Sequence, residues 1–171
     1  DVGDVVVPSQ FLQHDMDARP LFARWQVPGY ATPAFGCDTS LTQGLLRAAQ
    51  DCVAAATNWQ EPMLAGLQLR AHCGLIASGD QFIVSAQTSH LIRHDLQTAG
   101  YQPLAVEMEG AAIAQTCADY AVPFAAVRTI SDRADDNAHV DFPAFVNAVA
   151  SRYAQHIMAH WLQNQASTGS A

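Results

Sequence analysis

Long apolar runs and a surplus of basic residues are both missing from this sequence of 171 residues. No apolar run approaches the length that a bilayer-spanning helix needs, so we do not expect a membrane protein. Eight Lys and Arg stand against sixteen Asp and Glu, which gives a net charge of -8. Because an acidic surface attracts neither nucleic acid nor an anionic membrane, we expect neither as a partner.

Cysteine motifs are missing as well. The four cysteines are widely scattered and form no CxxC pair, which argues against a zinc or redox site. Three of them lie in apolar stretches, and we expect small core residues of a protein from the reducing cytoplasm. These three are Cys52, Cys73 and Cys117; the fourth is Cys37.

The seven histidines form no HExxH motif. His90 and His94 are spaced four residues apart on a predicted helix, and so are His156 and His160. Either pair could hold a metal, but exposed helix surface is the favoured interpretation. We therefore predict no metal and no cofactor.

Half of the residues are hydrophobic, which at this length allows one domain, residues 1–171, with a sizeable core. No signal-like segment opens the chain. Since the sequence starts at Asp1 without an initiator Met, we do not expect Asp1 to be the start of the gene.

The most informative stretch covers residues 103–135. Two short apolar runs with β-branched residues, 104–106 and 124–130, each follow a proline and indicate buried strands. Apolar residues at helical spacing lie between them, so the unit is predicted to be strand, helix, strand. The helical stripe consists of Ala111, Ala112, Ile113, Ala114, Cys117 and Ala118.

Acidic residues follow both predicted strands. Glu107 and Glu109 close the first strand, and Ser131 and Asp132 close the second. If the strands are parallel, both sets lie at the same carboxyl edge of the sheet, where such folds bind ligands. Carboxylates at buried strand ends are costly to desolvate unless something binds them, which indicates a functional site. The alternative is that Glu107 and Asp132 only cap the helix or turn that follows.

Four short motifs carry a family resemblance: Val2-Gly-Asp-Val-Val-Val7, Ser78-Gly-Asp-Gln-Phe-Ile83, Ala105-Val-Glu-Met-Glu109 and Val127-Arg-Thr-Ile-Ser-Asp132. In this order they resemble the nucleoside phosphorylase and nucleosidase superfamily, and most closely the methylthioadenosine/S-adenosylhomocysteine nucleosidases. The resemblance extends to about Leu162 and begins in the middle of the family's domain. It implies an α/β fold, a three-layer sandwich of the nucleoside phosphorylase type with a mixed, mostly parallel central sheet flanked by helices.

The resemblance also implies a reaction, the hydrolysis of the N-glycosidic bond of 5'-methylthioadenosine or S-adenosylhomocysteine with release of adenine. Asp132 would be the catalytic acid that protonates purine N7, and Ser131 would orient it. Glu109 would bind the ribose hydroxyls, and Met108 would pack against the sugar. Glu107 would support these residues through backbone or carboxylate contacts.

Residues for the purine base follow from the same resemblance. Phe82 would stack on adenine, and the Ile83 backbone would hydrogen-bond the ring. Phe142 aligns with an aromatic residue that closes over the nucleoside in the family. Arg128 either helps to hold the attacking water or phosphate or pairs with Glu107.

The stretch 10–35 has no helical or strand period and is long for a loop in a compact domain. Such segments are usually functional or cover a partner. By resemblance, Phe22 and Pro28 fall where the nucleosidases present residues to the neighbouring subunit's active site, which implies a homodimer. The alternative is ordinary packing on the same subunit.

Two parts of the family's site have no counterpart in this sequence: a general-base glutamate near the start of the domain and a glycine-rich loop after an early strand. We therefore expect that an N-terminal part of the domain is missing, because a sheet cut at Asp1 would expose a long unpaired edge. Three functions stay open at this point: a hydrolase, a phosphorylase of the same fold that uses phosphate, and a non-catalytic relative.

The flanking segments supply the rest of the predicted architecture. We expect a short strand that Pro8 ends, a strand over residues 67–78, and helices over residues 41–57 and 88–99. Thr39 or Ser40 would cap the first helix, and Gly100 would end the second. A long C-terminal helix and a frayed tail over residues 165–171 complete the chain. The predicted inward residues are Leu91, Ile92 and Leu96 in the helix over residues 88–99. In the C-terminal helix they are Phe145, Val146, Val149, Tyr153, Ile157 and Trp161.

Overall fold

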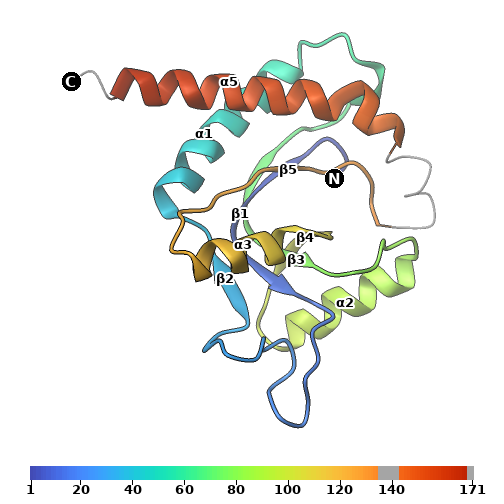
Figure 1. Ribbon diagram of the computed structural model, residues 1–171. Coiled ribbons are helices and arrows are strands. Elements are labelled where there is room, and N and C mark those ends of the chain that lie inside the picture. The colour runs from blue at the N-terminus through green and yellow to red at the C-terminus, as the bar shows by residue number, and fades with distance from the viewer. Residues whose placement is uncertain (135–142, 169–171) are drawn as a thin grey trace.

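A mixed sheet of five strands forms the middle of the protein in the computed structural model, which describes residues 1–134 and 143–168 (Figure 1). Strand β1 (Val5–Gln13) pairs along its whole length with the parallel strand β3 (Ala71–Ser78). β4 (Pro103–Glu107) continues the parallel order beyond β3. On the other side of β1, the antiparallel strands β2 (Ala34–Gly36) and β5 (Arg128–Thr129) pair with different halves of it.

β1 does not end at Pro8, contrary to the prediction. Pro8 has no N–H to donate, and the pairing register with β3 shifts between Pro8 and Gln10, as in a β-bulge. The bulge lets the strand continue for five more residues. Residues 10–13 therefore belong to β1, and the irregular segment before β2 covers residues 14–33. β3 is also shorter than predicted, since it starts at Ala71.

β5 differs from the prediction in length and in direction. Only two residues of the expected strand over 124–130 form β5, and they run antiparallel to β1 and therefore to β4. The preceding residues alternate between two apolar clusters, with Ala125 and Val127 on one side and Phe124 and Ala126 on the other. Side-chain packing, rather than strand pairing, therefore holds this extended segment. The direction of β5 could not be predicted, because an apolar run has the same pattern in a parallel and in an antiparallel pair.

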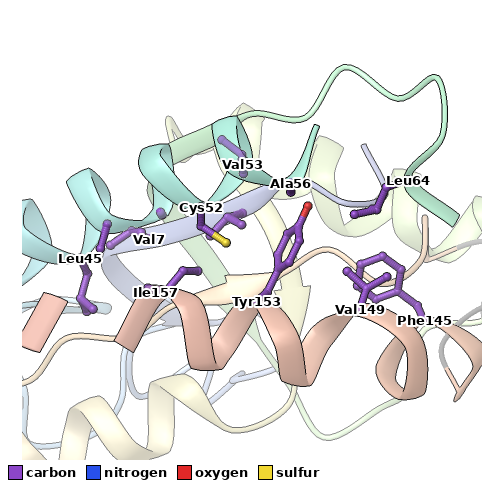
Figure 2. Close-up of a cluster of buried hydrophobic side chains, with 13 residues drawn as sticks. Val7, Leu45, Cys52, Val53, Ala56, Leu64, Phe145, Val149, Tyr153 and Ile157 are labelled. Carbon is purple, nitrogen blue, oxygen red and sulfur yellow. The ribbon is translucent and has the colours of Figure 1, made fainter. Parts of the chain in front are cut away.

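Helices cover both faces of the sheet. α1 (Thr39–Ala56) and α5 (Ser151–Thr168) pack together over one face, and Val5 and Val7 of β1 contribute to the core between them (Figure 2). α3 (Gly110–Asp119) covers the opposite face. Its Ala111 and Ala114 pack with Val6, Phe11 and Ile76.

α2 (Ala86–Thr98) lies on the face opposite to α3. Leu96 of this helix packs against Leu75 and Ala77, whereas Ile76 between them points toward α3. The result is a three-layer α/β sandwich with a mixed sheet, which confirms the predicted fold class. Two short helical segments complete it, η1 (Pro62–Leu64) before β3 and the π-helical η2 (Val146–Ala150) before α5.

The helix ends are set by residues that the predictions partly missed. Asp38 caps α1, because its carboxylate accepts the Leu41 N–H at 2.8 Å; neither Thr39 nor Ser40 is the cap. Gly100 follows α2 with a φ of 89°, which confirms the predicted glycine stop. α5 continues through residues 165–168 of the predicted frayed tail.

Burial confirms the main apolar stripe of the C-terminal segment: Phe145, Val149, Tyr153 and Ile157 are all buried. Several other expected core residues are exposed. They are Leu91, Ala112, Ile113, Ala118 and Val146, and Cys73 was also wrongly assigned to the core. Periodicity shows which residues share a stripe, but it does not show how far the covering layer extends. No helix within residues 1–134 and 143–168 combines the length and the apolar character of a membrane-spanning segment.

The packing of α5 on α1 generates a stability prediction. Ile157→Ala removes a fully buried side chain from the cluster in Figure 2 and should lower the free energy of unfolding by about 2–5 kcal/mol. Met158→Ala, at an exposed neighbouring position, should cost less than about 1 kcal/mol. Urea unfolding of both variants measures the difference, and equal losses would contradict the assigned helix face.

Candidate active site

A cleft of about 950 Å³ lies beside the ends of β3 and β4, and β5 forms another of its walls. Eight of the predicted site residues line it: Phe82, Ile83, Glu107, Met108, Glu109, Arg128, Ser131 and Asp132. The structure therefore brings these residues together although β5 does not run in the predicted direction. Phe22 and Pro28 are exposed outside this cleft, and Phe142 lies outside the described residues.

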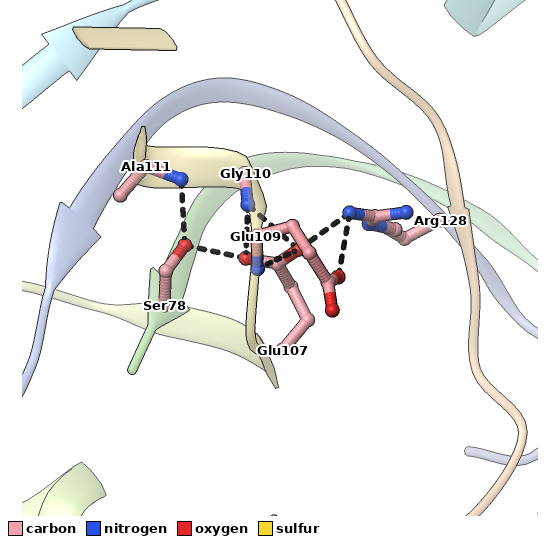
Figure 3. A network of polar contacts seen from close by, with 6 residues as sticks. All are labelled: Ser78, Glu107, Glu109, Gly110, Ala111 and Arg128. Carbon is pink, nitrogen blue, oxygen red and sulfur yellow. Dashed lines mark hydrogen bonds and ion pairs between the residues drawn. The ribbon is translucent and has the colours of Figure 1, made fainter. Parts of the chain in front are cut away.

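Glu107, which lines this cleft, is the centre of a polar network (Figure 3). Its carboxylate accepts hydrogen bonds from the Ser78 hydroxyl and from the Gly110 N–H, the latter at 2.9 Å to either oxygen. The Glu109 N–H also donates to it at 3.2 Å. An Arg128 guanidinium nitrogen lies 2.6 Å from the second carboxylate oxygen.

The network also supplies the N-terminal cap of α3. Glu109 occupies the cap position but makes no side-chain capping hydrogen bond. Glu107 accepts the first helical N–H instead, and the Ser78 hydroxyl accepts the Ala111 N–H at 2.8 Å. Glu107 therefore caps α3 as the capping alternative predicted, and it also lines the cleft. Ser78 was not predicted as a site residue, although it begins one of the four motifs and ends β3.

Burial by itself would raise the pKa of Glu107. The hydrogen bonds from Ser78 and Gly110 and the positive charge of Arg128 outweigh that effect and hold the pKa below its ordinary value. Glu107 is therefore an ionised carboxylate at neutral pH, and its hydrogen-bonding capacity is largely occupied by the protein.

Arg128 pairs with two carboxylates. Besides Glu107, its terminal nitrogen lies 3.3 Å from a carboxylate oxygen of Glu109, whose side chain is 63% exposed. Arg128 was expected either to hold the attacking water or phosphate or to pair with Glu107, and the structure shows the pairing with Glu107. The pairing balances the positive charge of Arg128 inside the cleft.

Asp132 lies in the turn after β5. It accepts a hydrogen bond from the Ser131 hydroxyl at 2.8 Å and another from the Ala134 N–H at 2.8 Å. A carboxyl group has more hydrogen-bonding sites than these two contacts use, and Asp132 also lines the cleft. Asp132 thus holds its own turn and forms part of the cleft wall.

Aromatic and apolar surface is available beside these acids. Phe82 is 47% exposed and Met108 is 40% exposed, and both line the cleft. Ile83 is buried and also lines the cleft. A cleft with one exposed aromatic face and several carboxylates suits a flat, partly apolar ligand that carries hydroxyl groups. Within residues 1–134 and 143–168, no group of three His, Cys, Asp or Glu is placed to hold a metal ion.

Comparison with known proteins gives a family and several related structures. The pattern of the phosphorylase superfamily matches residues 1–161. A 5'-methylthioadenosine/S-adenosylhomocysteine nucleosidase from Neisseria meningitidis, solved with methylthio-immucillin-A, is 32% identical with a TM-score of 0.77. The match covers 96% of this chain and 63% of that protein.

Two further solved structures are similar to this chain. The S-adenosylhomocysteine nucleosidase from Streptococcus pyogenes, in complex with 5-methylthiotubericidin, is 30% identical with a TM-score of 0.75, over 96% of this chain and 61% of that one. The nucleosidase from Colwellia psychrerythraea, in complex with adenine, is 27% identical with a TM-score of 0.74. The match covers 95% of this chain and 60% of that protein. This chain thus spans less than two thirds of the length of these relatives.

The lowered pKa of Glu107 generates a prediction about stability and pH. Because its folded-state pKa lies below the ordinary 4.5, its ionised form stabilises the fold above that value, and this stabilisation disappears as the pH falls through the folded-state pKa. Glu107→Gln should lower the free energy of unfolding at neutral pH by about 1–3 kcal/mol. It should also remove part of the loss of stability on acidification.

Urea unfolding between about pH 6 and about pH 3 tests this prediction. Glu109→Gln is the matched control, because its carboxylate is mostly exposed and shares the same arginine. A Glu107→Gln protein with the wild-type acid profile would contradict the assignment.

Proposed function

We propose a function from one premise: the chain belongs to the phosphorylase superfamily. The proposed activity is hydrolysis of the N-glycosidic bond of 5'-methylthioadenosine or S-adenosylhomocysteine, which releases adenine. The observation that carries the proposal is the position of Asp132, which lines the same cleft as an exposed Phe82 ring and the Glu109 carboxylate. The solved relatives, named as nucleosidases of these two compounds, support the substrate class.

Asp132 is the proposed catalytic acid. Its proton passes to purine N7 while the bond between the ribose anomeric carbon and N9 breaks, so that the electron pair leaves with a neutral adenine. Water then adds to the anomeric carbon, and its proton would pass, by resemblance to the family, to a general-base glutamate that has no counterpart in this sequence. The hydrogen bond from Ser131 holds the Asp132 carboxyl in one orientation, which keeps the proton aimed at the base.

Glu109 is the proposed ligand of the ribose hydroxyls. Its single long contact with Arg128 and its exposed side chain leave oxygens to accept from two neighbouring hydroxyls. Its negative charge also favours the cationic ribose of the transition state. The exposed part of Met108 would pack against the sugar, while Glu107 keeps the strand end fixed.

Phe82 and Ile83 are the proposed contacts of the base. The exposed ring of Phe82 offers a face for stacking, and the Ile83 backbone would hydrogen-bond the purine edge. Phe142 is proposed to close over the nucleoside, by resemblance to the family.

Arg128 favours water over phosphate as the nucleophile. A phosphorylase must hold a phosphate with cationic groups, and the arginine in this carboxylate cluster is already paired with Glu107 and Glu109. A phosphate placed there would meet two negative charges.

The proposal includes a homodimer in the cytoplasm. Leu21 is 84% exposed and Phe22 is 37% exposed, and Pro28 is exposed on the same segment, residues 14–33. A partner subunit would cover this apolar surface, and Phe22 and Pro28 would then border the partner's cleft.

Asp132→Asn tests the role of the acid. The amide keeps the size of the side chain but cannot transfer a proton to N7, so kcat for adenine release should fall by about 10²–10⁴. The unfolding midpoint should stay near that of the wild-type protein. Asp51→Asn, on the exposed surface of α1, is the matched control and should keep full activity. Wild-type turnover by the Asp132→Asn protein would contradict the proposed mechanism.

Phosphate dependence tests the nature of the nucleophile. Release of adenine from 5'-methylthioadenosine by the full-length protein should proceed at the same rate with and without inorganic phosphate. The sugar product should be the free reducing sugar, which a reducing-end assay detects. Release that strictly requires phosphate, with a sugar 1-phosphate as product, would show a phosphorylase instead.

A further inference from the structure

His14 is a buried histidine that no step of the proposed reaction uses. It directly follows β1, and its N–H donates to the Ser78 carbonyl at 2.8 Å, so it extends the pairing of β1 with β3. The residue is only 9% exposed, and its Nε2 has no hydrogen-bond partner among the described residues. A buried polar atom of this kind calls for an explanation.

The imidazole of His14 packs directly on Gly79. A Cβ atom at position 79 would lie 2.2 Å from His14 Nε2 and 2.6 Å from its Cε1, which is far inside van der Waals contact. The backbone of Gly79 does not have a positive φ, so the turn itself does not require glycine there. Gly79 is therefore explained by the close approach of the ring.

The turn that touches His14 leads into the candidate base-binding segment. The Gly79 N–H donates to the Glu107 carbonyl at 3.0 Å, and the Asp80 N–H donates to a carboxylate oxygen of Asp15 at 2.6 Å. The turn is thus held between the end of β4 and the two residues that follow β1. Phe82 and Ile83 come directly after it.

The segment beyond this turn has a cleft on either side. Gln81 and Ile83 line the main cleft and also a second cleft of about 260 Å³, in which His14 forms part of the wall. Because clefts flank this segment, its position depends on the turn that precedes it. That turn contacts His14 through Gly79 and Asp15 through Asp80.

We propose that His14 is a positioning residue for substrate binding: its ring, packed on Gly79, fixes the turn that places Phe82 and Ile83 in the cleft. The inference rests on the proposed function insofar as Phe82 and Ile83 bind the purine. Burial lowers the pKa of His14 although Asp15 and Asp80 are near, so the packed ring is neutral at neutral pH.

Two substitutions test the contact from its two sides in the full-length protein. His14→Ala removes the ring and should raise KM for 5'-methylthioadenosine about 10-fold, with kcat within about 3-fold of wild type. Gly79→Ala pushes the turn away from the ring and should raise KM similarly. His94→Ala, on the exposed surface of α2, is the matched control and should leave KM unchanged.

The double variant separates positioning from general damage. In His14→Ala/Gly79→Ala the added methyl group occupies part of the space that the ring has left, so KM should lie closer to wild type than in either single variant. A His14→Ala protein with the KM of wild type would overturn the inference. Fully additive losses in the double variant would overturn it as well.

Hydrogen exchange keeps the inference testable apart from the activity. The amides of residues 79–83 should exchange faster in His14→Ala than in wild type, while those of β1 before the bulge should not change. If the wild-type protein releases no adenine, the proposed function fails, and the exchange result still decides about His14. Unchanged exchange over residues 79–83 would overturn the positioning role.

Discussion

The mostly buried carboxylate of Glu107, with the donors around it, is the feature on which the rest of the site depends. It lies at the end of β4 and accepts hydrogen bonds from β3, through Ser78, and from the first turn of α3, through Gly110, while Arg128 of β5 pairs with it. Desolvating a carboxylate is costly, and only such a set of donors makes its burial tolerable. Because the donors come from β3, the start of α3 and β5, satisfying this one charge fixes how these elements meet at the cleft.

The three acids of the cleft consequently have different roles. The Glu107 side chain is only 13% exposed and its oxygens are occupied by the protein, whereas the Glu109 side chain is 63% exposed and has one long contact with Arg128. Asp132 lies between these extremes, with its own turn and Ser131 as partners and a place in the cleft wall. The first acid gives the cleft its shape, and the other two are available to a ligand.

The fold class was implied by the family resemblance. The strand before Glu107 and the helix after it were predicted from the residues themselves, because apolar period and proline positions are local signals. The sequence did not predict the direction of β5, since its partners Val5 and Val6 lie more than a hundred residues away and the apolar pattern is the same for either direction. The strand beyond Pro8 was missed because a bulge cannot be distinguished from a strand end by sequence alone. Ser78 was missed although it begins one of the four motifs, because its role and that of His14 depend on contacts across the sheet.

Strand-end positions group the acids of the site, the family resemblance adds the other residues, and the structure places eight of the predicted residues around one cleft. A crystal structure of the full-length protein with adenine bound tests their assignment most directly. We expect the Asp132 carboxyl within about 3 Å of purine N7 and the Phe82 ring stacked on the base. Adenine bound outside this cleft, or with Asp132 turned away from N7, would contradict the assignment.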